Sequence, residues 1–256
     1  MDAVVLCIAS EVEKDYIEEW IEYHLALGFC KIYIIDNSVE NIFQKLQNDT
    51  IIVFHFPGEA HQIPSYIMFF QTIGCNHKWV AVIDVDEFIV LKKHNNIIDF
   101  LKEYCKSGAV AIHWVYFGSN GHTTYSNKPL LERFTMRQKE YTNTVKCIVC
   151  ANDVSYYHNS HFPVLKNEKE IKDTNNNIVT CAENKNGDDS ICQINHYFCK
   201  SRQEFIERRI NKKRADNGEY YEDCFYSKDF NEIEDLTAWN FYKNHLSLKG
   251  KLVSNE

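Results

Sequence analysis

The sequence predicts an α/β fold: a Rossmann-like, mixed but mostly parallel sheet flanked by helices. Three observations carry this prediction. Continuous apolar runs typical of buried strands alternate with segments of helical periodicity up to about residue 117. Turn-forming residues close several of the runs. The chain has 256 residues, 45% hydrophobic and 25% charged, which is an ordinary globular composition and enough for a substantial core.

The first strand and helix have the clearest signals. Residues 3–9 form a continuous apolar run, as expected for a buried strand. Ser10, with Glu13 three residues later, makes a capping box. Apolar and aromatic residues then recur at helical spacing over 16–27, and Gly28 is a suitable terminator.

The elements that follow keep this alternation. We expect strands at 31–35, 51–56, 79–83 and 109–117, and helices at 64–75 and 99–106. In such sheets, ligands bind beyond the carboxyl ends of the strands. Asp36, Asp84 and Asp86 all fall at such ends.

The second half is less regular. Residues 116–125, rich in glycine, serine and aromatics, suggest a binding loop, and 134–149 suggest a pair of strands. Residues 168–190 are polar and predict an exposed, mobile excursion. Helices are expected at 201–213, with a capping box from Ser201 and Glu204, and at 231–245. We therefore expect one domain at 1–220 with a C-terminal helical extension, 221–256, packed on it.

Charge and cysteine content narrow the functional classes. The formal net charge of −8 argues against a nucleic-acid partner, which normally requires a basic excess or a basic face. Neither a secretory leader nor a membrane-spanning stretch is apparent, so we expect a cytoplasmic protein with reduced thiols. Cys147 and Cys150 have zinc-ligand spacing, but their surroundings are typical of a strand and no second pair follows.

Asp84 and Asp86 form the most informative pair in the sequence. Carboxylates at positions i and i+2 project to the same side of an extended chain. At the end of a buried strand they would repel each other unless a cation lay between them. Their oxygen atoms suit Mg²⁺ or Mn²⁺, which would stabilise charge on a departing diphosphate. The alternative is an acidic turn that caps the next element.

Four blocks of residues occur in a fixed order over roughly residues 4 to 220. The first and second include Ser10-Glu11, Glu19-Trp20 and Gly28, then Gln62, Tyr66, Trp79 and Asp84-Val85-Asp86-Glu87-Phe88. The third and fourth include His113-Trp114 and Phe117-Gly118-Ser119, then Asn195-His196-Tyr197, Lys200-Ser201 and Arg214. Together they resemble glycosyltransferase family 92 and its bacterial relatives in the family 2-like, Asp-x-Asp group.

The resemblance implies a GT-A fold, a nucleotide-sugar donor and a divalent cation, usually Mn²⁺. It assigns Asp84 and Asp86 to the metal and the diphosphate. His196 matches the position of a third metal ligand, although an ordinary strand histidine is the alternative. The predicted partners are a UDP-sugar, UDP-galactose among the candidates, and a glycan or other hydroxyl acceptor.

Residues that would contact the donor are also expected from the resemblance or from position. The set comprises Glu11, Asp36, Gln62, Asp84, Trp114, Lys200 and Arg214. Asp36 suits the nucleoside, or simply forms a turn. Trp114 offers an aromatic face to a sugar ring, or belongs to the core. Lys200, Arg209 and Arg214 could neutralise the diphosphate, whereas Arg208 and Lys212 are interpreted as a solvated helix face.

The catalytic base has several candidates and no decisive motif. An inverting transferase needs a carboxylate or histidine near the acceptor hydroxyl. Glu132, Asp189 and His122 are the predicted candidates, with Asp188 beside Asp189 as an alternative.

Two rival functions stay open at this point. A nucleotidyltransferase of similar fold would normally carry a glycine-rich, basic phosphate loop after the first strand, where this chain has Ser10-Glu11-Val12-Glu13. A non-catalytic sugar-binding module is the other alternative. A zinc site at His158 and His161 with Cys150 fits poorly, because the two histidines are spaced as in a loop.

Overall fold

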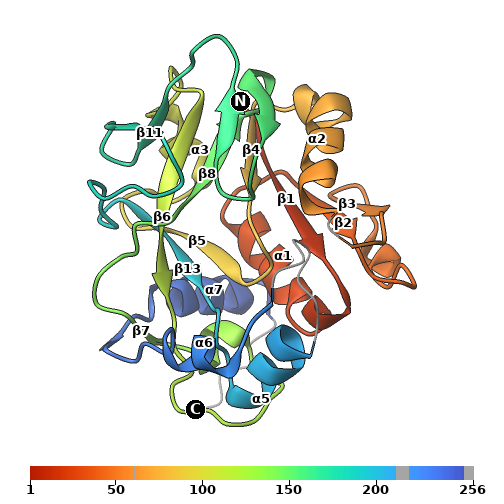
Figure 1. The fold of residues 1–256 in the computed structure, drawn as a ribbon, viewed down its shortest axis with the longest axis vertical. Coiled ribbons are helices and arrows are strands. Elements are labelled where there is room, and N and C mark those ends of the chain that lie inside the picture. The colour runs from red at the N-terminus through yellow and green to blue at the C-terminus, as the bar shows by residue number, and fades with distance from the viewer. Residues whose placement is uncertain (60, 212–218, 251–256) are drawn as a thin grey trace.

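The computed structural model describes residues 1–59, 61–211 and 219–250, and it shows one large mixed sheet with helices on both faces (Figure 1). The strand order in the main path is β12-β11-β6-β8-β4-β1-β2-β3, and β13 pairs with both β5 and β6. The strands are β1 (Ala3–Ala9), β2 (Lys31–Asp36), β3 (Ile51–His55), β4 (Trp79–Val82), β5 (Glu87–Leu91), β6 (Ala109–Tyr116), β8 (Val145–Cys150), β11 (Ile171–Asp173), β12 (Ile178–Val179) and β13 (Cys192–His196).

Most strands of this sheet point the same way. β1 pairs in parallel with β2 and β4, β2 with β3, and β6 with β11 and β13. β8 runs antiparallel between β4 and β6, so those two strands share one direction. β5 and β12 are also reversed. The predicted mixed, mostly parallel sheet is confirmed.

Helices cover the sheet on both sides. They are α1 (Ile17–Ala26), α2 (Gln62–Thr72), α3 (Ile97–Lys102), α4 (Leu130–Arg133), α5 (Arg202–Phe205), α6 (Glu222–Tyr226) and α7 (Thr237–Leu248). Two small antiparallel pairs lie off the main sheet: β9 (Val154–Tyr157) with β10 (Pro163–Leu165), and β7 (Met136–Arg137) with β14 (Ile233–Glu234). The predicted helices at 16–27, 64–75 and 99–106 are present with shifted ends.

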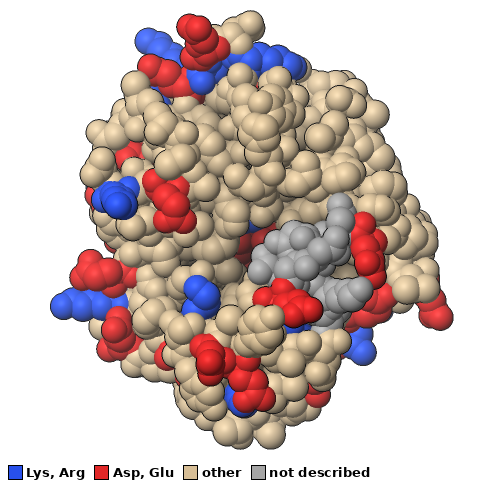
Figure 2. All heavy atoms as spheres, in the orientation of Figure 1, with Lys and Arg blue, Asp and Glu red and all other residues tan. Residues whose placement is uncertain are grey.

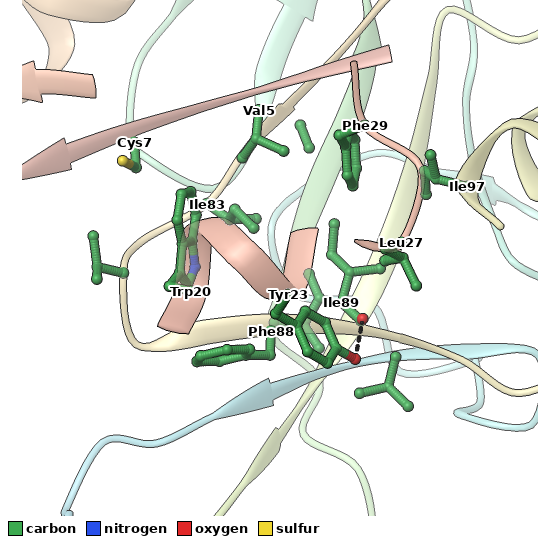
Figure 3. Packing of buried hydrophobic residues seen from close by; sticks show 14 of the residues in the cluster. Val5, Cys7, Trp20, Tyr23, Leu27, Phe29, Ile83, Phe88, Ile89 and Ile97 are labelled. Carbon is green, nitrogen blue, oxygen red and sulfur yellow. Dashed lines mark hydrogen bonds between the residues drawn. The ribbon is translucent and has the colours of Figure 1, made fainter. Parts of the chain in front are cut away.

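The core is divided by the sheet because side chains alternate along each strand. In β1, Val5 and Cys7 belong to the cluster that contains α1, α3 and α7, while Val4 and Leu6 belong to the cluster under α2. Figure 3 shows Trp20 and Tyr23 of α1 packed among the first set, with the Tyr23 hydroxyl donating to the Ile89 carbonyl. A continuous apolar strand therefore reflects burial on both faces.

The two strands expected within 134–149 are present as β7 and β8, and their partners lie elsewhere: β7 pairs with β14, and β8 inserts between β4 and β6. Another local prediction needs correction. The polar segment 168–190 is not merely an excursion, since β11 and β12 extend the sheet there. Asp173 is fully buried at its turn, where its carboxylate accepts from the backbone N–H groups of Asn175 and Asn177.

The C-terminal helix begins later than predicted. Residues 233–234 form β14 instead of helix, and α7 starts at Thr237. Tyr242 and Leu246 of α7 are buried in the cluster that contains α1. No helix in the described parts of the chain combines the length and apolarity needed to cross a membrane. None of the ten cysteines forms a disulfide.

Candidate active site

A pocket of about 460 Å³ lies at the carboxyl ends of the parallel strands. Its wall includes Glu11 after β1, Asn37 after β2, and Asp84 after β4. β6, β13 and the π-helical turn Ile206–Ile210 complete it with Trp114, His196, Arg208 and Arg209. The pocket therefore occupies the position that parallel α/β sheets use for ligands.

Asp84 lies at the rim of this pocket beside a buried lysine. Lys146 of β8 is 1% exposed, and its Nζ lies 3.0 Å from Asp84 Oδ2 and 3.6 Å from Glu87 Oε2. Glu87 Oε2 also accepts from the Asp84 backbone N–H at 2.9 Å. Burial acts to lower the pKa of Lys146, but Asp84 and Glu87 outweigh it and raise that pKa above its usual value. Lys146 is therefore a fixed positive charge beneath Asp84.

Asp86 is more deeply buried than Asp84 and lies next to two cations and a histidine. Arg209 forms an ion pair with its Oδ2, Lys200 Nζ lies 3.8 Å from the same oxygen, and His196 Nε2 lies 3.8 Å from Oδ1. Burial acts to raise the pKa of Asp86, but the charges of Arg209 and Lys200 outweigh it and hold that pKa well below its usual range. Asp86 is ionised at any physiological pH.

His196 is held among aromatic rings. Its ring centroid lies 4.2 Å from that of Trp114 and 5.2 Å from that of Tyr116. Burial lowers its pKa well below the usual value, so the imidazole is neutral. Within the described part of the chain, its Nδ1 and the Trp114 Nε1 are buried without a hydrogen-bond partner.

The side chains predicted to hold a metal share one pocket, but their arrangement does not fit an ion. A divalent cation needs Asp86 oxygens that are open to it, and Arg209 already pairs with Asp86. Among the described residues, no group of three or more histidine, cysteine, aspartate or glutamate side chains could hold a metal. The repulsion expected between Asp84 and Asp86 is relieved by Lys146 and Arg209 of the chain itself.

Some of the residues predicted to contact the donor line the pocket, and others do not. Glu11, Gln62, Asp84 and Trp114 line the pocket together. Asp36 is fully buried outside the lining set, where its carboxylate accepts from the Ser38 and Phe43 backbone N–H groups at 2.8 and 2.9 Å.

The cations of the fourth block behave differently from one another. Lys200 lies behind Asp86 and donates to the Tyr197 carbonyl at 3.0 Å. Arg208 was interpreted as part of a solvated face, and this is wrong: its side chain is 10% exposed and pairs with Glu13 at 2.9 Å. Arg214 and Lys212 lie outside the described residues.

The three predicted catalytic bases are not among the residues that line the pocket. Glu132 pairs with Lys128 at 2.8 Å on α4. Asp189 pairs with Lys92 at 2.9 Å, and His122 Nε2 contacts the Arg133 carbonyl at 3.2 Å. The partner of Glu132 is local in sequence, four positions away, whereas the partners of Asp189 and His122 lie 97 and 11 positions away.

Sequence reasoning also missed functional residues. Lys146 carried a usable signal, because a lysine inside the apolar strand Val145–Cys150 implies a buried counter-charge. Arg209 is among the residues predicted to neutralise the diphosphate, but its pairing with Asp86 and that of Arg208 with Glu13 carried no signal, since these partners lie more than 120 positions away.

A family model supplies the comparison that decides the family. The model for glycosyltransferase family 92 matches residues 74–224, which is more than half of the chain and includes Asp84, Asp86 and the π-helical turn. The chain belongs to glycosyltransferase family 92. Its mixed α/β sheet with helices on both faces is the architecture expected for the GT-A type.

Two curated members of family 92 are similar to parts of this chain. A family 92 protein of Oryza sativa subsp. japonica is 23% identical over 150 residues, which is 53% of this chain and 25% of that protein. A family 92 protein of Ricinus communis is 25% identical over 142 residues, which is 49% of this chain and 25% of that protein. The aligned part of the family 92 chain thus spans about a quarter of each relative.

Some solved structures are distantly similar to this chain. The bifunctional IspDF from Campylobacter jejuni matches with a TM-score of 0.39 and 15% identity, covering 68% of this chain and 49% of that one. TarS from S. aureus matches with a TM-score of 0.36 and 15% identity, covering 61% and 30%. GlyE, a glycosyltransferase of Streptococcus pneumoniae, matches with a TM-score of 0.29 and 12% identity, covering 44% and 30%.

Proposed function

We propose that this family 92 chain transfers a hexose from a nucleotide-diphosphate sugar to a hydroxyl of a glycan or similar acceptor. A UDP-sugar is the proposed donor, UDP-galactose among the candidates, and the proposed outcome is inversion at the anomeric carbon. The observation that carries the proposal is the pocket at the carboxyl ends of β1 and β4, where Asp84 and Asp86 meet three cationic side chains. A relationship to the family 2-like Asp-x-Asp group belongs to the same proposal.

The chemistry requires little covalent work from the protein. The acceptor oxygen forms a bond to the anomeric carbon while the bond from that carbon to the diphosphate oxygen breaks. The acceptor proton passes to a base, and the nucleoside diphosphate leaves with the electron pair of the broken bond. The main task of the pocket is to bind negative charge on the leaving diphosphate.

Different lining residues of the pocket suit the nucleoside and the sugar of the donor. Glu11, Asn37 and Gly58 lie beyond β1, β2 and β3, where the nucleoside of the donor would fit. Trp114 offers an aromatic surface to the sugar. Two cations, Arg208 and Arg209, also line the pocket. The diphosphate of the donor would be bound beside them.

Mn²⁺ or Mg²⁺ is the proposed cofactor, and it would supply further positive charge to the diphosphate. Asp84 and Asp86 are the residues predicted to hold it, although their arrangement in this structure does not fit an ion. Asp86 is open to such an ion only when Arg209 has left it, because the guanidinium pairs with the same carboxylate.

A donor screen tests the proposal. The full chain is incubated with several nucleotide sugars, with and without Mn²⁺ and without acceptor, and release of nucleoside diphosphate is measured. We expect hydrolysis of a UDP-sugar that Asp84→Asn reduces by at least about a hundredfold, the scale of losing a residue that stabilises the leaving group. The anomer formed with an acceptor, read by NMR, reports inversion.

The matched control is Asp99→Asn, which changes an exposed carboxylate on α3 that pairs with Lys102. Its turnover should equal that of the wild type. A nucleotidyltransferase would instead release inorganic pyrophosphate from a nucleoside triphosphate. If no nucleotide sugar were turned over and no nucleoside diphosphate bound, a transferase role for the pocket would have to be abandoned.

A further inference from the structure

We propose that His161 is the catalytic base: its Nε2 takes the proton from the acceptor hydroxyl as that oxygen bonds to the anomeric carbon. This inference rests on the proposed function and names the residue for a step that the chemistry requires. The three bases predicted from the sequence lie outside the lining of the pocket, whereas His161 belongs to it.

His161 is carried by the hairpin that β9 and β10 form. The two strands are antiparallel, and residues 158–162 connect them. The side-chain oxygen of Asn159 accepts from the backbone N–H groups of His161 and Phe162 at 2.9 and 3.0 Å. This turn therefore fixes the backbone from which the imidazole reaches the pocket.

The imidazole of His161 is held from strand β8. Its Nδ1 lies 3.3 Å from the Val145 carbonyl oxygen. A carbonyl can only accept, so this contact places the proton of the neutral ring on Nδ1 and the lone pair on Nε2. The next residue of β8 is Lys146, which pairs with Asp84. One strand therefore holds both His161 and Asp84 in the wall of the pocket.

Trp114 lies between His161 and the place where the sugar would bind. The ring centroids of His161 and Trp114 are 4.8 Å apart in an edge-to-face contact. Trp114 is the residue that offers an aromatic surface to the sugar under the proposed function. Arg208 and Arg209, beside which the diphosphate would be bound, come from the π-helical turn instead. Different elements therefore serve the incoming hydroxyl and the leaving group, which suits a displacement in which the two occupy different sides of the anomeric carbon.

The carboxylates that line the pocket have other partners or lie at its other end. Ion pairs hold three of them: Glu13, Asp84 and Asp86. Glu11 accepts from the Val39 backbone N–H at 2.8 Å. Glu59 directly follows Gly58, where the nucleoside would fit. These interactions and positions favour a base that is not a carboxylate.

His196 is the other histidine among the described residues of the lining. Burial lowers its pKa well below the usual value, and a group that resists protonation is a weak general base. His161 is only half-buried, so water can stabilise the imidazolium that forms when it takes a proton. The two histidines of the pocket therefore differ in the property that a base needs.

The step balances without a further reactant. The acceptor oxygen loses its proton to Nε2 of His161 and bonds to the anomeric carbon. The bond from that carbon to the diphosphate oxygen breaks, and its electron pair leaves with the diphosphate. The imidazolium then releases the proton to solvent before the next turnover.

The test compares two nucleophiles on UDP-galactose, or on the UDP-sugar that the donor screen selects. Water must lose a proton as it attacks, whereas azide is an anion with none to lose. His161→Asn should lower the rate of hydrolysis by about a hundredfold and leave the rate of the azide reaction within about twofold of the wild type. The asparagine amide can still donate to the Val145 carbonyl, but it places no proton acceptor where Nε2 was.

His158→Asn is the matched control. His158 lies in the same turn, is exposed, and lines a separate cavity of about 540 Å³. Its variant should hydrolyse the donor like the wild type. The acidic limb of the pH–rate profile, which reports protonation of the base, should be present in the wild type and in His158→Asn but absent from His161→Asn.

If His161→Asn does not fold, as judged by circular dichroism, His161→Gln takes its place with the same expected result. Hydrolysis at the wild-type rate in these variants would overturn the assignment of the base. So would a loss of the azide reaction as large as the loss of hydrolysis, because His161 would then position the donor. Both outcomes would leave the proposed function intact. A wild type that neither turns over a nucleotide sugar nor binds a nucleoside diphosphate would overturn the base together with the proposed function.

Discussion

At the scale of single residues, the site shows where sequence reasoning was sound and where it stopped. Two carboxylates at the end of a buried strand do require positive charge, as the spacing of Asp84 and Asp86 implied. The structure supplies it from Lys146 and Arg209, which are 62 and 123 positions away from their partners. No local pattern encodes contacts at such separations. The predicted bases, each chosen from its neighbours in sequence, lie outside the residues that line the pocket.

His24 gives a pH-dependent prediction at this scale. Burial lowers its pKa to about 3 from the usual value of 6.5. Between pH 6.5 and pH 3, His24 is therefore protonated in the unfolded chain but neutral in the folded chain. The free energy of unfolding falls as the pH drops below 6.5. From pH 7 to pH 5 the wild type should lose about 2 kcal/mol more than His24→Gln, because only the former titrates.

The measurement is urea unfolding of both proteins at several pH values. The ring of His24 contacts the Trp20 carbonyl through Nδ1 at 2.8 Å, and glutamine keeps an amide that can make the same bond. Other groups titrate alike in the two proteins and cancel in the difference. Parallel stability curves between pH 7 and pH 5 would show that His24 can be protonated in the folded state.

At the scale of elements, signals that are local in the chain were predicted well. Strands β1, β2 and β4 follow apolar runs, and the capping box of Ser201 and Glu204 is present at the start of α5. The later strands were harder to predict, because β8 and β11 join the sheet through partners distant in sequence, and β12 joins it through β11. Polar content alone suggested an excursion at 168–190, whereas tertiary pairing decided the outcome.

The capping box at Ser201 couples an element to the site. Ser201 is fully buried, and its hydroxyl bonds with the Glu204 carboxylate and backbone N–H. α5 continues directly into the turn that carries Arg208 and Arg209. Ser201→Ala should cost about 1–2 kcal/mol of stability and weaken UDP binding several-fold.

The control is Ser247→Ala on α7, where an exposed hydroxyl donates to the Lys243 carbonyl. Its stability and UDP affinity should match those of the wild type within about 0.5 kcal/mol. Thermal unfolding and a UDP titration measure both quantities. Unchanged UDP affinity in Ser201→Ala would mean that the cap does not position the arginines.

At the scale of the whole molecule, two features stand out: the distribution of surface charge and the packing of the C-terminal helices. On the visible part of the face in Figure 2, acidic and basic side chains are interspersed and no continuous basic patch forms. In the same orientation, α5, α6 and α7 all lie in the half of the molecule away from the N-terminus (Figure 1). α7 contacts α1, α4 and β5, so the C-terminal helix packs on elements that lie far before it in the sequence.

This packing predicts that α7 unfolds together with the sheet. Leu246 is 8% exposed and belongs to the cluster that contains α1, whereas Leu248, two positions later, is 88% exposed. Leu246→Ala should therefore destabilise the whole chain by about 2–3 kcal/mol, while Leu248→Ala should change stability by less than about 0.5 kcal/mol. With Trp239 of α7 changed to Phe in both proteins, unfolding followed by the fluorescence of the remaining tryptophans, Trp20, Trp79 and Trp114, should coincide with loss of helical circular dichroism. Two separate transitions, or a Leu246→Ala protein whose tryptophan transition stays at the wild-type midpoint, would show that the C-terminal helix folds independently of the sheet.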